Sequence, residues 1–280
     1  GDHALECEVS GMNKMNKVSA NIVMTCVIIW LLIPLVATII YSVFDNWTGI
    51  IPYGFSLRNY ETIFGDASFL KAIYQTILIC IIPIVVTILV VLLALFVVTI
   101  YFPSLEKYVQ ILCMIPYTIQ GVILSVSILA LYAKTGTFLS NRLIMLLGTY
   151  CVIILPYIYQ GIRNSMHAVN MPMLLEAAEM LGASKLYAFF RVIVPNIITG
   201  ITVSSLLAVG ILFGDYVIIR NLSGSAVTNV QVFLYQTMKH SSTEASAVFV
   251  VIMMMTFLIT ALVLYFQSKN KLEQIQKEGR

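Results

Sequence analysis

The chain has 280 residues, of which 60% are hydrophobic and only 10% charged, and its formal net charge is +3. A soluble domain of average composition carries about 25% charged residues, so this composition excludes a water-soluble protein and indicates membrane lipid as the main solvent. The small net charge, with no basic tract interleaved with aromatic residues, gives no indication of a nucleic-acid partner.

The first eleven residues precede a Met-Asn-Lys sequence and include three acidic residues. They resemble the remnant of an expression tag, with Met12 as the native start. We therefore predict that residues 12–280 form a single transmembrane domain. The first apolar run is too long for a cleavable signal peptide and is not followed by a small-residue cleavage site.

Six apolar runs are long enough to cross a bilayer, which takes about 20 residues of α-helix. Helix is the expected structure because lipid offers no partner to an unpaired backbone group. The alternating pattern of a membrane β-barrel is absent. The sequence therefore predicts an all-α membrane protein with six transmembrane helices, at roughly residues 18–44, 73–101, 109–132, 143–162, 196–219 and 245–267.

An even number of spans places both termini on one side of the membrane. That side carries ten of the 16 Lys and Arg residues, so the positive-inside rule predicts that both termini are cytoplasmic. The first outer loop, residues 45–72, contains the segment Phe55-Ser-Leu-Arg-Asn-Tyr60 followed by Thr62-Ile-Phe64. This pattern predicts a short amphipathic piece at the membrane interface.

The inner loop at residues 163–194 is long for a small membrane protein, and it is neither Gly/Ser-rich nor highly charged. Asn170 suits a helix N-cap and Pro172 a first helical turn. Strong helix formers follow, and Gly182 suits the left-handed position that ends a helix. Ser184 can cap a second helix. The loop is therefore predicted to form two short helices joined by a sharp glycine turn, and such a structured loop indicates a partner.

The first of these helices carries side chains suited to an interface. Ala177 and Ala178 allow another backbone to approach closely, and Glu176 can accept hydrogen bonds or pair with an arginine. Apolar anchors are offered by Met173, Leu174, Leu181, Phe189 and Phe190. An ordinary amphipathic helix lying on the membrane is the alternative interpretation of the same pattern.

Charged groups inside membrane spans are costly and are candidates for function. Asp215 lies in the fifth run, where it could face a transport pathway, or could instead cap a helix end or pair with Arg220. Gly210 and Gly214 could mark a helix break beside it. Further pathway candidates are Tyr216, Tyr117, Gln120 and Tyr157.

Catalytic and metal-binding patterns are not found in the sequence. The five cysteines lack metal-ligand spacing, and His3, His167 and His240 are scattered in positions typical of exposed or tag residues. No GxxxxGK[ST] motif is present, so the chain is not expected to hold ATP or any other cofactor by itself. We predict that it is not an enzyme.

A specific motif runs through the inner loop. The motif consists of Glu176-Ala177-Ala178, three residues, Gly182, nine residues and then Val192-x-Val194-Pro195. It resembles the EAA signature of ABC importer permeases, with valine at two aliphatic positions. The motif lies between the fourth and fifth spans, where that family carries it, and the six-span layout extends the resemblance over nearly the whole native chain.

The resemblance implies the type I ABC importer permease fold with a cytoplasmic coupling helix. It implies that an ATPase dimer, which binds ATP and Mg, docks onto Glu176, Ala177, Ala178 and Gly182, with Ala183 nearby. It also implies a second permease subunit, a paralogue in most such systems, and an extracellular or periplasmic substrate-binding protein. The location implied is the bacterial cytoplasmic membrane. A stand-alone secondary transporter is the alternative function, but it would not explain the EAA motif.

The segment after the loop narrows the resemblance. This part of the chain contains the segments Phe213-Gly-Asp-Tyr-Val217, Leu222-Ser-Gly224, Val232-Phe-Leu-Tyr235 and Ser242-Thr-Glu244-Ala-Ser-Ala247. Together these segments resemble spermidine/putrescine-type permeases. A polyamine is therefore the expected substrate. Importers of sugars, phosphonates or iron are the alternatives, although sugar-importer permeases usually show a Gly-Gly-Pro turn where this chain has Ser223-Gly-Ser225.

Overall fold

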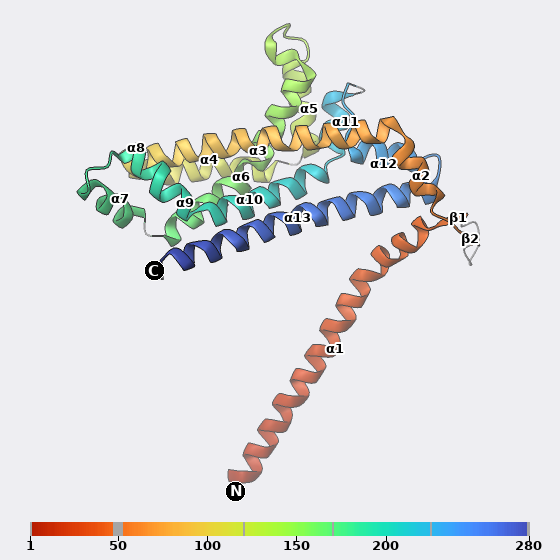
Figure 1. Ribbon diagram of the computed structural model, residues 1–280, viewed down its shortest axis with the longest axis horizontal. Coiled ribbons are helices and arrows are strands. Elements are labelled where there is room, and N and C mark those ends of the chain that lie inside the picture. Colours follow the sequence, from red (N-terminus) through yellow and green to blue (C-terminus); the bar gives the residue numbers. More distant parts are fainter. Residues whose placement is uncertain (1, 47–52, 120, 170, 225, 279–280) are drawn as a thin grey trace. The chain divides into compact units, whose positions relative to one another are not determined.

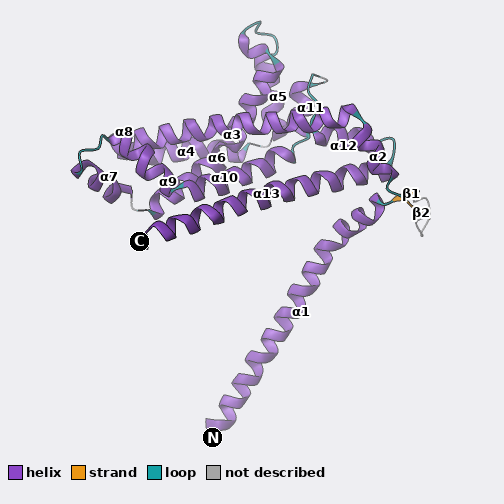
Figure 2. Cartoon of the chain, viewed as in Figure 1, coloured by secondary structure: helices purple, strands orange, loops and turns teal. Residues whose placement is uncertain are grey.

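The computed structural model describes residues 2–46, 53–119, 121–169, 171–224 and 226–278, and nearly all of them are helical (Figure 2). The chain divides into two compact units, one of residues 1–65 with 237–251 and the other of residues 66–236 with 252–280. The long helix α13 (Ser242–Glu278) contributes residues to both units. The all-α class predicted from the sequence is confirmed, with one small pair of strands added to it.

The first unit contains α1 (Asp2–Ser42), the strands β1 (Phe44–Asn46) and β2 (Tyr53–Phe55), and α2 (Arg58–Gly65). The strands pair antiparallel, with Phe44 opposite Phe55, and they were not predicted. Phe55 therefore belongs to a strand, and the predicted amphipathic piece begins only at Arg58. Its buried Asn59 side chain donates hydrogen bonds to the Ser42 and Phe44 carbonyls, both at 3.2 Å, which fixes α2 against the end of α1.

The second unit is a bundle with short connecting turns (Figure 1). Its elements, in chain order, are α3 (Ala67–Tyr101), η1 (Pro103–Leu105), α4 (Glu106–Thr118), α5 (Gly121–Tyr132), η2 (Phe138–Ser140), α6 (Arg142–Ala168), α7 (Met171–Met180), α8 (Lys185–Ala188), η3 (Phe189–Ile193), α9 (Val194–Asn196), α10 (Ile198–Phe213), α11 (Val217–Ser223) and α12 (Val230–Met238).

Helix α6 is the centre of this bundle, and it packs against α3, α4 and α10. Leu146, Tyr150, Ile154, Ile158 and Ile162 recur every four residues along α6, and each is fully buried. This spacing places them on one face of the helix. Figure 1 shows α3, α6 and α10 running side by side, and each of the three packs against the other two.

Small residues allow α6 and α10 to approach closely. A Cβ atom added to Gly161 of α6 would lie 2.5 Å from the Ser204 Cβ atom of α10. One added to Gly200 of α10 would lie 2.6 Å from the Ser165 Cβ atom and 2.9 Å from the Gly161 carbonyl oxygen. Each helix thus presents glycine and serine four residues apart to the other. Such small residues are typical of tightly packed membrane helices, where the backbones themselves are in contact.

The prediction of six spans is matched by four single helices and two bent helix pairs among the described residues. Four helices are long and apolar enough to cross a membrane, and the number reaches six if each of two bent helix pairs is one span. The third span divides into η1–α4 and α5, which meet at 98°, and the residues from Lys185 to Phe213 contain a bend of 66°.

Two predicted boundaries are also wrong. Helix α6 continues to Ala168, so Arg163 lies in a helix and not in the loop. Helix α10 ends at Phe213, where Gly214 caps it, and not at residue 219. The proposed break at Gly214 is therefore found, whereas Gly210 lies inside α10.

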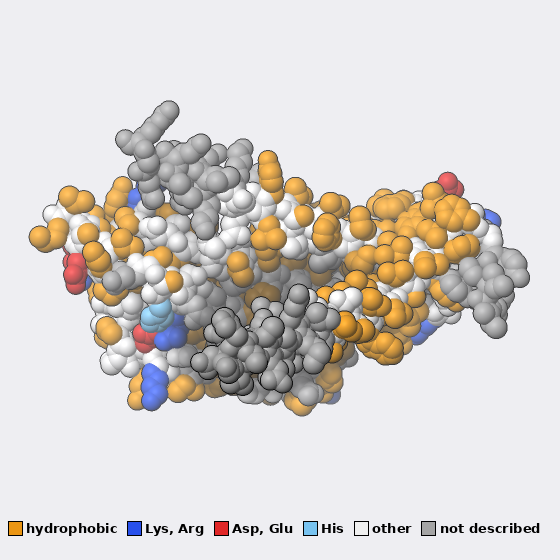
Figure 3. Space-filling model, turned by 90° about the horizontal axis from the view of Figure 1, so that it is seen from below, with side chains coloured by type: hydrophobic (Ala, Val, Ile, Leu, Met, Phe, Trp, Pro, Cys, Tyr) orange, Lys and Arg blue, Asp and Glu red, His pale blue; other side chains and the backbone are white. Residues whose placement is uncertain are grey.

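The surface of the described residues suits a lipid environment. Hydrophobic side chains cover much of the face shown in Figure 3. Large apolar side chains of several spans are more than half exposed, among them Leu112, Val126 and Leu207. An exposed apolar surface of this extent would aggregate in water, and it is stable only against lipid or a protein partner.

Candidate functional site

The predicted glycine turn of the inner loop is present. Gly182 has a φ of +83° and follows the last turn of α7. Its N–H donates to the Glu179 carbonyl at 2.9 Å, and the Ala183 N–H donates to the Ala178 carbonyl at 3.0 Å. These two bonds form a Schellman motif, with Gly182 at the left-handed position that favours glycine. Asn170, the predicted N-cap, lies outside the described residues.

The second predicted helix is α8, and it is short. The Ser184 hydroxyl accepts a hydrogen bond from the Tyr187 N–H at 3.4 Å, as expected of a cap. The chain then enters the π-helical turn η3, whose first residue is Phe189. Phe189 is fully buried, and its ring lies 5.0 Å from that of Phe96. The interpretation of Phe189 as an exposed anchor is therefore wrong, because it belongs to the core of the bundle.

The surface here called the α7 outer face consists of Met173, Glu176, Ala177 and Met180 on the exposed side of α7, together with Leu181, which directly follows the helix. The side chains of Met180 and Leu181 are each 89% exposed, and that of Met173 is 67% exposed. Glu176 and Ala177 are also exposed. Met180 was missed by the sequence analysis, which treated it only as a helix former. Apolar side chains so exposed at the end of an ordered helix are typical of a protein interface.

The five residues that the motif predicts to dock therefore differ in their exposure to solvent. Glu176, Ala177 and Gly182 are exposed, Ala183 is half-buried and Ala178 is buried. Ala178 faces inward with Met171, which is 3% exposed. Met171 belongs to the buried core of the bundle, and the exposed residues remain available to a partner.

Asp215 lies where the chain passes from α10 to α11, and its carboxylate is fully engaged. Its Oδ2 accepts hydrogen bonds from the Tyr150 hydroxyl at 2.8 Å and from the Ile219 N–H at 3.1 Å. Its Oδ1 accepts from the Ile218 N–H at 3.3 Å. Asp215 thus caps the first turn of α11, which is one of the roles considered from the sequence. No ion pair joins it to Arg220 among the described residues.

The tyrosine candidates fall into two separate ring contacts. The rings of Tyr117 on α4 and Tyr157 on α6 lie 5.6 Å apart, and Tyr117 is 66% exposed. The rings of Tyr216 and Tyr235 lie 4.7 Å apart. Gln120 lies outside the described residues. A pathway role for these residues stays a prediction.

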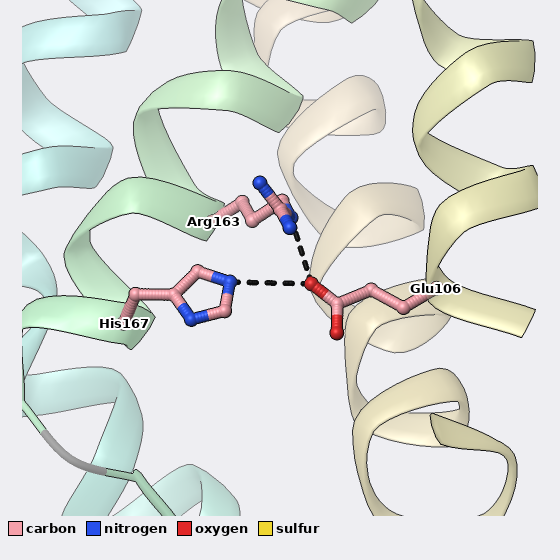
Figure 4. Close-up of polar contacts among 3 residues, drawn as sticks. All are labelled: Glu106, Arg163 and His167. Atoms are coloured by element: carbon pink, nitrogen blue, oxygen red, sulfur yellow. Dashed lines mark hydrogen bonds and ion pairs between the residues drawn. The ribbon is translucent and has the colours of Figure 1, made fainter. Parts of the chain in front are cut away.

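A further polar group joins α4 to the end of α6 (Figure 4). One carboxylate oxygen of Glu106, Oε1, lies 2.8 Å from Arg163 Nε and 3.2 Å from His167 Nε2. The sequence analysis missed this group because it ended the fourth span at residue 162 and treated His167 as scattered. The spacing of Arg163 and His167, four residues apart, was the available signal, since it places both on one face of a helix that continues past residue 162.

These features define a multi-span membrane subunit that presents a short, ordered helix with an apolar outer face for a partner. The chain belongs to the family described as binding-protein-dependent transport system inner membrane component, whose model matches residues 92–272. The structure is similar to the crystal structure of a bacterial ABC transporter involved in the import of the acidic polysaccharide alginate, with a TM-score of 0.67 and 17% identity. That match covers 87% of this chain and 92% of the other. No curated protein sequence matches the chain.

The family membership settles the class of the protein. The chain is a permease subunit of an ABC importer, a multi-pass protein of the inner membrane. It is not catalytic, because ATP hydrolysis in this family is carried out by partner subunits.

Proposed function

We propose that the α7 outer face is the surface on which the ATPase dimer docks. The observation that carries this proposal is the exposure of Met180 and Leu181, 89% each, directly before the ordered turn at Gly182. Exposed apolar side chains on a rigid element provide the anchors that dominate protein interfaces. Glu176, on the same face, adds a carboxylate that can accept hydrogen bonds or pair with an arginine of the partner.

In the proposed mechanism the chain transmits force and performs no chemistry. Closure of the two nucleotide-binding subunits around ATP and Mg moves the docked α7, and the spans then alternate between inward and outward openings. Both termini and α7 lie in the cytoplasm in this scheme. A second permease subunit, a paralogue of this chain, completes the pathway, and a substrate-binding protein delivers the solute from outside.

The charge reversal Glu176→Lys tests the docking surface. We expect at least a tenfold loss of ATPase subunits co-purified with the membrane complex, because the substitution places a cation where the partner presents groups complementary to a carboxylate. The same substitution at the exposed Glu61 of α2 serves as the matched control and should leave co-purification unchanged. Equal recovery of the ATPase with Glu176→Lys and the native chain would contradict docking at this face.

For the substrate we propose a polyamine. The support is the resemblance of the segment from Phe213 to Ala247 to spermidine/putrescine-type permeases, and the position of Asp215 within it. A second candidate, an acidic saccharide, is favoured by the similarity of the structure to the alginate importer. Substrate-stimulated ATP hydrolysis by the reconstituted importer, measured with spermidine, putrescine and oligoalginate, separates the two. Stimulation by oligoalginate alone would overturn the polyamine proposal.

The substitution Asp215→Asn removes the charge and keeps one acceptor oxygen for the helix cap. Both carboxylate oxygens accept hydrogen bonds in the native chain, so the loss of one acceptor should lower the free energy of unfolding by about 1–3 kcal/mol. We expect slower polyamine uptake with undiminished co-purification of the ATPase, because the carboxylate would no longer attract a cation. Uptake kinetics equal to those of the native chain would show that Asp215 acts only as a cap.

A further inference from the structure

We infer that Glu106, Arg163 and His167 form a polar clamp that transmits movement of α7 to α4, and that all three are positioning residues for transport. The inference rests on the proposed docking of the ATPase at α7. It assigns a function to side chains outside the EAA motif, at the point where the loop joins the membrane bundle.

The clamp joins the ends of two antiparallel helices. Glu106 is the first residue of α4, and Arg163 and His167 lie in the last two turns of α6. The carboxylate therefore lies at a helix N-terminus and the basic side chains near a helix C-terminus, where each sign of charge is favoured by the helix dipole. A single oxygen of Glu106 contacts both basic side chains, so loss of the carboxylate breaks both contacts together.

A cavity of about 610 Å³ lies beside the clamp. Met171 and Pro172, in the first turn of α7, line one part of it, and Thr99 and Pro103, at the turn between α3 and α4, line another. Glu106, Arg163 and His167 line it as well. Met171 also belongs to the buried core of the bundle, so the cavity lies beside that packing and does not replace it. The clamp supplies a polar connection at the edge of the cavity.

The route from α7 to α4 then follows from the helix order. His167 precedes the first residue of α7, Met171, by four positions, so movement of α7 displaces the last turn of α6. The clamp carries this displacement to the first turn of α4. At its other end α4 carries Tyr117, whose ring contacts Tyr157 of α6. The rigid α4 therefore links the coupling loop to a pathway candidate more than two helical turns away.

The experiment uses the complete importer in proteoliposomes and measures three quantities, which are co-purified ATPase, ATP hydrolysis and substrate uptake. For Glu106→Gln and for Arg163→Gln we expect native co-purification but about a tenfold fall in substrate transported per ATP hydrolysed, a typical size for coupling between two sites. The exchanged pair Glu106→Arg with Arg163→Glu should recover part of the loss, because it restores the attraction between positions 106 and 163 while both helix dipoles oppose the reversed charges. Loss of folding would lower assembly, ATP hydrolysis and uptake together, whereas loss of the clamp lowers only the amount transported per ATP in variants that assemble normally. Lys107→Gln, which removes a charge next to Glu106, is the control and should transport normally.

The outcomes separate the clamp from the docking surface. Native transport per ATP with Glu106→Gln overturns the clamp while leaving docking intact. If the single variants fail to assemble, His167→Gln breaks one contact only and keeps the inference testable through the same ratio. A ratio unchanged in every assembled variant, or an exchanged pair no better than the single variants, also overturns the clamp. Loss of ATPase with Glu176→Lys reports on docking alone.

Discussion

Replacing Gly182 by valine is expected to abolish ATP-driven uptake and to release the ATPase from the membrane subunits. The φ of +83° at this position is a left-handed conformation, which costs a residue with a Cβ atom about 1–2 kcal/mol and a β-branched residue more. A Cβ atom at Gly182 would meet nothing within 4 Å, so the effect would come from the backbone and not from a clash. Relaxation of the turn would break the hydrogen bonds that hold Met180 and Leu181 in place.

Uptake and co-purified ATPase, measured on the reconstituted importer, check this expectation. Gly136 provides a matched control, because it has a φ of +64° and open space around it but lies in the loop after α5, away from α7. Gly136→Val should therefore retain uptake. Gly182→Asn should retain much of it too, since asparagine tolerates the left-handed region. If Gly182→Val and Gly136→Val behave alike, the turn at Gly182 has no special part in coupling.

Gly200→Val is expected to destroy the folded bundle. The added Cβ atom would lie 2.6 Å from the Ser165 Cβ atom and 2.9 Å from the Gly161 carbonyl oxygen. The second contact is with backbone, so α6 and α10 would have to separate along their whole contact. Overpacking of a well-packed core typically costs about 1–3 kcal/mol, and separation of two central helices would cost more. We expect aggregation on extraction, or a fall in the unfolding temperature in detergent of about 10 °C or more.

Two further variants show whether the close approach is the cause. Gly210→Ala lies in the same helix with nothing within 4 Å of the new methyl group. It should be neutral or stabilising by up to about 1 kcal/mol, the difference in helix propensity between glycine and alanine. Gly200→Ala should be destabilising, and Ser165→Gly should recover part of that loss. A Gly200→Ala variant as stable as Gly210→Ala would show that the helices tolerate separation.

Local chemistry made the loop that contains α7 and α8 predictable from its sequence. A capping serine, a run of helix formers and one glycine at the end of a helix determine structure within a few residues, and the Schellman turn at Gly182 and the cap at Ser184 were both found. The apolar runs could be recognised from the sequence for a similar reason, because a helix needs about 20 apolar residues to cross a bilayer.

The parts that escaped prediction depend on packing between distant segments. The segment Met114-Ile-Pro116-Tyr117-Thr-Ile-Gln120-Gly121 indicates a kinked polar site within the third span, but the sequence gives no angle, and the 98° between η1–α4 and α5 could not be predicted from it. The Glu106 clamp joins residues 57 positions apart, which no local pattern reports. Asp215 was identified as unusual, but its partner Tyr150, 65 residues away, could not be found from the sequence. Phe189 was assigned to the surface because composition cannot distinguish an anchor from a core residue.

The exposure of Met180 and Leu181 also bears on subunit stoichiometry in the cell. In the proposed orientation, a newly made permease that has not met its ATPase presents both side chains, each 89% exposed, to the cytosol. Such uncovered apolar groups are what chaperones and proteases bind in incomplete assemblies. Synthesis of this subunit in excess over its ATPase should therefore shorten its half-life, so that the same two residues that join the complex would also mark unassembled copies for removal.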